Sequence, residues 1–388
     1  MNAPKLFTPL QIRGVRMRNR IAIAPMAQYC ALDGCATDFH FAHLAAFATG
    51  GAALVFTEST KVLRSGMGSH GDLCLWNDNH VASLSRITRF VRQAGAVPAM
   101  QLNHSGRKAR SQRPWEGFGP LQGREEDLWP VVAPSALRHA DGWAMPAEMS
   151  VADIGEMIDA WVHSARLALT AGFQVLEIHG AHGYLVHQFL SPEANRRQDR
   201  YGGSLANRMR FALELTEALR AAWPDELPLF FRVSATDDLG WILEDTVKLA
   251  RELKALGVDV VDCSSGGMTS RSPTASGGSK GLGYQVPYAA EVRRQAGIAA
   301  MAVGLIVDPH QAEAILQAGD ADIIAVGREA LFDPYWPHHA AQALSFDSGF
   351  SGWPQQYGWW LDRRRKSLDP EGAGRKLATL PQIRQPNR

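Results

Sequence analysis

The chain has 388 residues, 46% of them hydrophobic and 20% charged, which is the composition of a globular protein with a large core. Its 40 Lys and Arg residues balance 39 Asp and Glu residues, so the net charge of +1 gives no basis for binding nucleic acid or an anionic membrane. No apolar run is long enough for a transmembrane helix, the N-terminal residues lack the apolar centre of a signal peptide, and the four cysteines show no CxxC spacing. We therefore expect a cytoplasmic protein that acts on small molecules.

Short apolar runs alternate with longer segments along the chain. The runs are Ile21–Pro25, Ala53–Thr57, Val97–Leu102, Gln174–Ile178, Leu229–Val233, Val258–Asp262, Ala299–Val303 and Asp322–Val326. Near-continuous apolar strands of this kind are typical of a parallel sheet that is covered on both faces.

The segments between these runs have the signatures of helices. Ser150 and Asp153 form a capping box, and Asp308-Pro309 and Asp333-Pro334 each place a capping acid before a proline suited to the first helical position. Strand–helix units repeated in this way predict a (β/α)₈ barrel. An open doubly wound sheet is the alternative, but it would need a glycine-rich turn after its first strand, where this chain has Ala24-Pro25-Met26-Ala27.

The remaining segments fit a single domain that covers residues 1–388. The barrel would span about residues 20–342, and residues 343–388 would form a C-terminal tail. Gly106–Met149 is rich in Pro, Gly and Trp and is too long for a simple connection, so we expect an excursion over the barrel mouth.

Chemistry in such barrels lies at the carboxyl ends of the strands. Glycines follow the last three runs, including Gly304 and Gly327, and Arg328 comes next. Glycine lets backbone N–H groups approach an anion, and arginine adds a charged fork, so these turns predict a phosphate site; the alternative is that the glycines only make tight turns. None of the expected strands ends in lysine, and no carboxylate pair stands at the mouth, so neither a Schiff-base aldolase nor a glycosidase is indicated. A phosphate-bearing cofactor would then carry out the difficult step.

His179, His182 and Tyr184 follow the fourth run and admit three interpretations. As zinc ligands, the two histidines lack further partners nearby, because His40 and His43 lie at the start of a helix after the first strand, so we expect no metal. They could also be structural, with their ring N–H groups bonded to carbonyls. In the third interpretation, which we prefer, they donate to a substrate oxygen and leave Tyr184 to donate a proton.

The sequence resembles the Old Yellow Enzyme family, in particular its shorter, thermophilic-like class of flavin-dependent ene-reductases. The resemblance runs nearly end to end and includes the motifs LFTPLQIRGVRMRNRIAIAPM, MQLNHSGRKA, EIHGAHGYLVHQFLSPEANRRQDRYGGSLANRMRF, FFRVSATD, DCSSGG, GYQVPYAAEVR, MAVGLI and VGREALFDP. It implies a barrel that holds FMN noncovalently, takes electrons from NADPH or NADH, and passes them by ping-pong hydride transfer to activated C=C bonds.

The resemblance also implies roles for individual positions. The flavin would be contacted by Ala24, Pro25, Met26, Ala27, Ser59, Gln101, Arg232, Gly304, Gly327 and Arg328, the last three at its phosphate. His179 and His182 would bind the acceptor's carbonyl or nitro oxygen, Tyr184 would protonate the α-carbon, and Tyr29 would contact the substrate.

Departures and alternatives accompany this assignment. Ala27 stands where much of the class has a flavin-tuning cysteine, and Ser59 stands where the class often has alanine. We expect Cys30 to be an inert buried thiol. Members of the class use a C-terminal aromatic or arginine in a neighbouring subunit's pocket, which suggests Trp360 as a substrate contact in a homodimer or homotetramer. A quinone or nitro-compound reductase with the same flavin site, and a non-redox barrel that binds a phosphorylated ligand, are the competing hypotheses.

Overall fold

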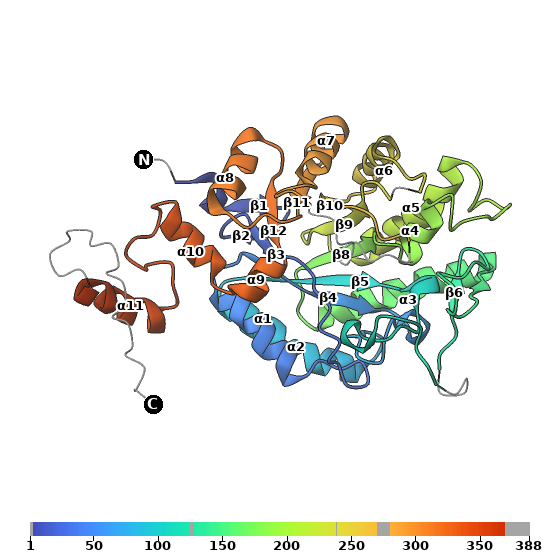
Figure 1. Ribbon diagram of the computed structural model, residues 1–388, viewed down its shortest axis with the longest axis horizontal. Helices are drawn as coiled ribbons and strands as arrows, with labels where there is room; N and C mark the ends of the chain where they lie inside the picture. Colours follow the sequence, from blue (N-terminus) through green and yellow to red (C-terminus); the bar gives the residue numbers. More distant parts are fainter. Residues whose placement is uncertain (1–2, 124–127, 238, 270–279, 369–388) are drawn as a thin grey trace, which may run out of the picture.

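The fold is a closed barrel of parallel strands wrapped by helices (Figure 1). The computed structural model describes residues 3–123, 128–237, 239–269 and 280–368. The barrel strands, in chain order, are β3 (Ile21–Ile23), β4 (Leu54–Lys61), β5 (Val97–Asn103), β8 (Val175–Gly180), β9 (Leu229–Ser234), β10 (Val260–Ser264), β11 (Ala299–Ala302) and β12 (Ile323–Val326). Each of the eight predicted apolar runs therefore forms a strand, and hydrogen bonds between β12 and β3 close the barrel.

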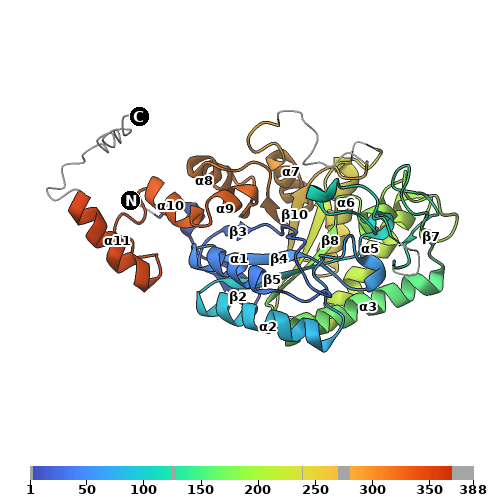
Figure 2. The same ribbon diagram turned by 60° about the horizontal axis from the view of Figure 1, so that its bottom comes forward.

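Helices follow the strands and cover the outside of the barrel (Figure 2). The longer ones are α1 (Asp38–Thr49), α2 (Asp78–Gln93), α3 (Val151–Thr170), α5 (Leu205–Ala222), α6 (Leu243–Ala255), α7 (Val286–Ala296) and α8 (Pro309–Ala318). Shorter helices are α4 (Leu185–Leu190), α9 (Arg328–Phe332) and α10 (Trp336–Ala343), and α11 (Gln355–Leu368) ends the described chain. Single 3₁₀ turns are η1 (Lys5–Phe7), η2 (Arg64–Gly66), η3 (Gly106–Lys108) and η4 (Pro114–Glu116).

Two of the three predicted helix starts are confirmed. Ser150 and Asp153 form the capping box of α3, and the Asp308 side chain accepts from Gln311 N at the start of α8, with Pro309 as the first helical residue. The third prediction is wrong: Asp333 ends α9, and α10 begins only at Trp336. The Asp333 carboxylate accepts from Tyr335 N and His339 Nδ1, so it is used in the connection rather than as a helix cap.

A short hairpin closes the amino-terminal end of the barrel. It consists of β1 (Leu10–Ile12) and β2 (Val15–Met17), and its Val15 and Met17 side chains join the apolar cluster inside the barrel, which includes Phe56, Phe230 and Met301. The interior is thus filled at this end, and the opposite, carboxyl ends of the strands remain available for a site.

The excursion after β5 carries its own small structure. Two short strands, β6 (Val132–Ala133) and β7 (Ala147–Glu148), pair there, and the buried Trp129 packs with Met67 and Val131. Residues 124–127 of the excursion and 369–388 of the predicted tail lie outside the described residues. Within the described ranges, no helix combines the length and hydropathy needed to cross a bilayer.

Candidate active site

His179 and His182 meet at the carboxyl end of β8. His179 is in the strand, whereas His182 lies in the following turn with a left-handed φ of +59°. Their rings are 5.1 Å apart, and His179 Nε2 is 3.4 Å from His182 Nδ1. Burial, together with the neighbouring His182 and Arg232, lowers the pKa of His179 well below its ordinary value, and burial beside Arg232 lowers the pKa of His182 likewise. Both rings are therefore neutral at neutral pH.

The hydrogen bonds of the two histidines determine which ring nitrogens can donate to a ligand. Ala181 N donates to His179 Nδ1 (3.2 Å), so the proton of His179 is on Nε2. His182 Nε2 is 2.7 Å from Ser264 Oγ at the end of β10, and this hydroxyl can donate to it and leave Nδ1 with the proton. The two nitrogens that face each other are then both donors, and they can converge on one oxygen.

Tyr184 stands next to this pair. It precedes α4, and its ring lies edge-on to that of His179 at 4.9 Å. Two lysines flank it, with Lys61 Nζ 5.3 Å and Lys108 Nζ 5.6 Å from the ring centroid. Burial raises the pKa of Tyr184, and Lys61 is the strongest opposing influence. The phenol is therefore protonated at neutral pH and can act as an acid.

Neither lysine was anticipated. We expected no barrel strand to end in lysine, yet β4 continues to Lys61, because a register shift between Phe56 and Ser59 adds one residue to its pairing with β5. Lys108 donates to His182 O (2.8 Å) and to Gly267 O, which fixes the turn that carries His182. Burial lowers the pKa of Lys108 to about 7. The sequence signal for Lys61 is weak, since TESTK is too polar to predict a buried strand end.

A second cluster lies on the inward side of β5, β8, β9 and β10. Gln101 Nε2 donates to Glu177 Oε1 (2.7 Å), and Arg232 Nε is 3.0 Å from Asp262 Oδ2. Burial, and then the charge of Asp262, raises the pKa of Glu177 well above its ordinary value, and burial raises the pKa of Asp262. Gln101 and Arg232 were expected at the site, but the two carboxyls were not. The sequence could have indicated Glu177 and Asp262, because each is an acidic residue within one of the predicted apolar runs.

The segment after β3 borders the candidate site on another side. Ala24 N donates to Val326 O (2.9 Å), which ties this segment to β12, and Ala27 is exposed. Cys30 is only partly buried, which corrects the expectation of a buried thiol; its Sγ is 3.7 Å from His40 Nδ1. That nitrogen accepts the Thr37 N–H (3.0 Å), so His40 caps α1. No group of His, Cys, Asp and Glu side chains in the described part of the chain has the arrangement of a metal site.

The predicted phosphate contacts lie at the ends of β11 and β12. Gly304 has a φ of +117°, which favours glycine, and nothing lies within 4 Å of a Cβ built on Gly327. Arg328 is exposed at the start of α9. The glycines after β10 have a different role, because a Cβ on Gly267 would lie 2.4 Å from His182 Cα. That turn supports the histidine pair.

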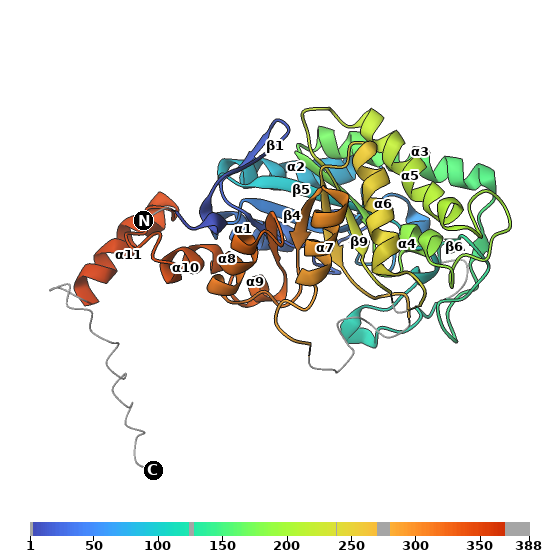
Figure 3. The ribbon, with the colours of Figure 1, turned by 90° about the horizontal axis from the view of Figure 1, so that it is seen from above.

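Besides the two histidines, two residues were assigned to substrate, and within this chain Tyr29 lies near the site whereas Trp360 does not. Tyr29 has a φ of +55°, and its ring lies edge-on to Trp115, 5.7 Å away, in the excursion. Trp115 is 65% exposed, so this pair stands at the rim. Trp360 is on α11, which projects from the barrel beyond α10 (Figure 3), and it is 66% exposed beside Trp359.

Comparison with known proteins decides the family. A sequence model of the NADH:flavin oxidoreductase / NADH oxidase family matches residues 5–347. The chain belongs to this family. An NADPH dehydrogenase from Geobacillus sp. (strain WCH70) is 42% identical over 343 residues, which are 87% of this chain and 94% of the relative.

Solved structures agree with this assignment. The old yellow enzyme homologue from Zymomonas mobilis is 26% identical with a TM-score of 0.73, and the match covers 88% of this chain and 93% of that one. Morphinone reductase is 25% identical with a TM-score of 0.73, over 88% and 90% of the two chains. This chain is therefore an FMN-dependent NAD(P)H oxidoreductase of the Old Yellow Enzyme family, as its motifs indicated.

The residues present fit a flavin. Among the described residues, Arg232 Nε makes no hydrogen bond, although it is 3.0 Å from Asp262 Oδ2, and buried Glu177 Oε2 has no hydrogen-bond partner either; Arg232 is 7% exposed. A guanidinium with free donors suits the electron-rich edge of a flavin ring. The open space beside Gly327 and the nearby Arg328 suit a terminal phosphate.

Proposed function

We propose that this enzyme reduces C=C bonds activated by a carbonyl or nitro group. The observation that carries the proposal is the convergence of His179 Nε2 and His182 Nδ1, 3.4 Å apart, beside the Tyr184 phenol. Two neutral donors aimed at one point bind an oxygen without transferring a proton to it, because their pKa values are far below neutral. Bound FMN supplies the hydride, which it takes from NADPH or NADH.

The protein groups have separate tasks in this reaction. The histidine pair withdraws electron density through the substrate oxygen, which makes the β-carbon electrophilic and stabilises the enolate oxygen that develops. Tyr184 then donates its proton to the α-carbon. A saturated carbonyl compound is the product. An NAD(P)H:quinone or nitro-compound reductase would need the flavin and the oxygen donors but not the phenol, since a quinone oxygen takes its protons from water.

Anaerobic titration of the reduced enzyme tests this proposal. The purified protein should be yellow, release FMN on denaturation and bleach with NADPH or NADH. Reoxidation should then be measured with cyclohexenone, a nitroalkene, a quinone and a nitroarene. We expect the two alkenes to reoxidise the flavin with formation of the saturated product. Reoxidation by the quinone and nitroarene but by neither alkene would favour the alternative, and a protein that binds no FMN would refute both.

A further inference from the structure

Lys61 is a buried lysine with an unusual set of partners. It is the last residue of β4 and is 4% exposed. Its Nζ donates to Ser59 Oγ (2.8 Å) and is 3.5 Å from Asp72 Oδ2. Asn103, opposite it on β5, also donates to Ser59 Oγ (2.7 Å). The Ser59 hydroxyl and the Asp72 carboxylate hold this ammonium in place at the end of β4.

The charge of Lys61 is directed at Tyr184. Its Nζ is 5.3 Å from the centre of the phenol ring, a distance at which a partly desolvated cation interacts strongly with a phenolate. Serine at position 59 is the feature that permits this geometry, since its hydroxyl accepts from Lys61 and Asn103 together. The register shift in β4 that brings Lys61 to the strand end also belongs to the same arrangement.

The other charged and titratable groups around Tyr184 do not replace it. Arg232 lowers the pKa of Tyr184 less than Lys61 does, and its Nε faces Asp262. Lys108 bonds the carbonyls of His182 and Gly267, with a pKa of about 7. Asp72 acts in the opposite direction and raises the pKa of Tyr184. The adjacent His179 is neutral, and burial raises the pKa of Tyr29, so neither contributes a charge at neutral pH.

We propose that Lys61 is a positioning residue for proton delivery: its ammonium stabilises the phenolate that Tyr184 leaves when its proton moves to the substrate. In this step the Tyr184 O–H bond breaks, its electron pair stays on the phenol oxygen, and the proton forms a C–H bond at the α-carbon of the enolate. Water then returns a proton to the phenolate. The inference rests on the proposed reduction of alkenes, but the electrostatic coupling of Lys61 and Tyr184 can be measured without an alkene.

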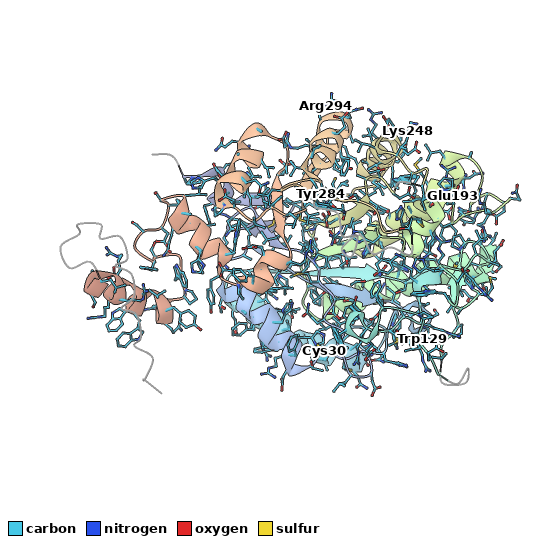
Figure 4. All side chains as sticks on the ribbon, in the orientation of Figure 1. Cys30, Trp129, Glu193, Lys248, Tyr284 and Arg294 are labelled. Atoms are coloured by element: carbon cyan, nitrogen blue, oxygen red, sulfur yellow. The ribbon has the colours of Figure 1, made fainter. Side chains whose placement is uncertain are left out.

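The coupling is tested by placing 3,5-difluorotyrosine at position 184 of the FMN-loaded enzyme and following its ionisation by ¹⁹F NMR. In Lys61→Met, which keeps the unbranched chain up to the ε position and removes the charged group, the ionisation should move to higher pH. Lys61→Arg should restore most of the difference. Lys248→Met is the matched control, because Lys248 lies on the outer side of α6 (Figure 4), and it should leave the ionisation unchanged.

Asp72→Asn provides a variant with the opposite sign. Removing this carboxylate takes away a charge that itself raises the pKa of Tyr184 and leaves the Lys61 charge uncompensated, so ionisation at position 184 should move to lower pH. If Lys61→Met does not fold, Lys61→Gln, which also removes the charge, takes its place and should move the ionisation to higher pH. An ionisation that is unmoved in Lys61→Met, or that Asp72→Asn moves upward, would overturn the inference, since loss of the ammonium must raise the pKa of the phenol and loss of the carboxylate that offsets it must lower that pKa.

Kinetics with the natural tyrosine separate this inference from the proposed function. Lys61→Met should slow reoxidation by cyclohexenone by about 10-fold, because a weaker acid gives up its proton more slowly. Reduction by NADPH and reoxidation by a quinone should be unchanged. If the NMR shifts appear but the parent enzyme reduces no alkene, the coupling holds and the proposed function fails. If the parent reduces alkenes and Lys61→Met does so equally fast, the role of Lys61 in proton delivery is refuted.

Discussion

Some residues of this site belong to one sequence motif, whereas others come from distant strands and meet the motif only in the folded barrel. His179, His182 and Tyr184 are close in sequence, and one turn after β8 suffices to bring them together. The groups that adjust them come from other strands: Ser264 from β10 and Lys61 from β4. No spacing rule links such positions, so the sequence indicates that the two histidines and the tyrosine lie together but not which groups fix their tautomers and charges.

Ala27 is the residue at which the flavin potential should be adjustable. Because Ala27 is exposed in the segment after β3, Ala27→Cys adds a sulfur without crowding the core, at a cost of at most about 1–3 kcal/mol. A thiol beside the ring can polarise it, so the reduction potential of bound FMN should change more than the thermal stability does. Spectroelectrochemical titration measures this, with Ala27→Ser as the control. An unchanged potential in a Cys variant that still binds FMN would show that this position does not tune the ring.

Elements were predicted well where burial is uniform and poorly where polar residues are buried. All eight apolar runs form barrel strands, with ends displaced by one to a few residues. The largest displacement is at β4, which continues through Thr57, Glu58, Ser59 and Thr60 to Lys61. Side-chain hydrogen bonds make this polar extension stable, and hydrophobic periodicity cannot detect them. The same limitation explains Asp333, whose side-chain partners lie in a connection rather than in a helix start.

The turn after β10 should be a determinant of acceptor binding. Gly267 has a φ of +93°, and a Cβ there would collide with the His182 backbone, whereas Gly203 has a φ of +80° and open space around its Cβ. Gly267→Ala and Gly203→Ala should each lose roughly 1–3 kcal/mol of unfolding free energy through backbone strain. Only Gly267→Ala should also weaken binding of phenol, which mimics an enolate oxygen. Phenol titration of the oxidised enzyme tests this, and equal affinities in the two variants would contradict it.

At the scale of the whole molecule, barrel closure was predictable but the partner of the tail was not. Strand–helix repetition predicts a closed barrel. No sequence pattern predicted the hairpin β1–β2, which fills the amino-terminal end of the barrel. The tail is anchored as far as Trp353, whose ring stacks on His338 at 4.5 Å and on Tyr335 at 5.4 Å. Beyond it, Trp359 and Trp360 are 51% and 66% exposed on α11.

We propose that a second copy of the chain covers this part of α11, in a homodimer or homotetramer that brings Trp360 to a neighbour's pocket. Light scattering after gel filtration should give a mass of two or four chains. Trp360→Ala should raise the KM for a bulky alkene acceptor with little change in the rate of reduction by NADPH. A monomeric mass in an active preparation would refute this arrangement.

Stopped-flow measurement of both half-reactions in Tyr184→Phe tests whether Tyr184 donates the proton during alkene reduction. Reduction by NADPH requires no proton from Tyr184 and should keep the parent rate. Reoxidation by cyclohexenone should slow by about 10²–10⁴-fold, and reoxidation by a quinone much less. Tyr201→Phe, whose hydroxyl donates to Glu214 on α5, is the control and should match the parent in every step. If Tyr184→Phe reduces cyclohexenone at the parent rate, another group supplies the proton and the account of this site is wrong.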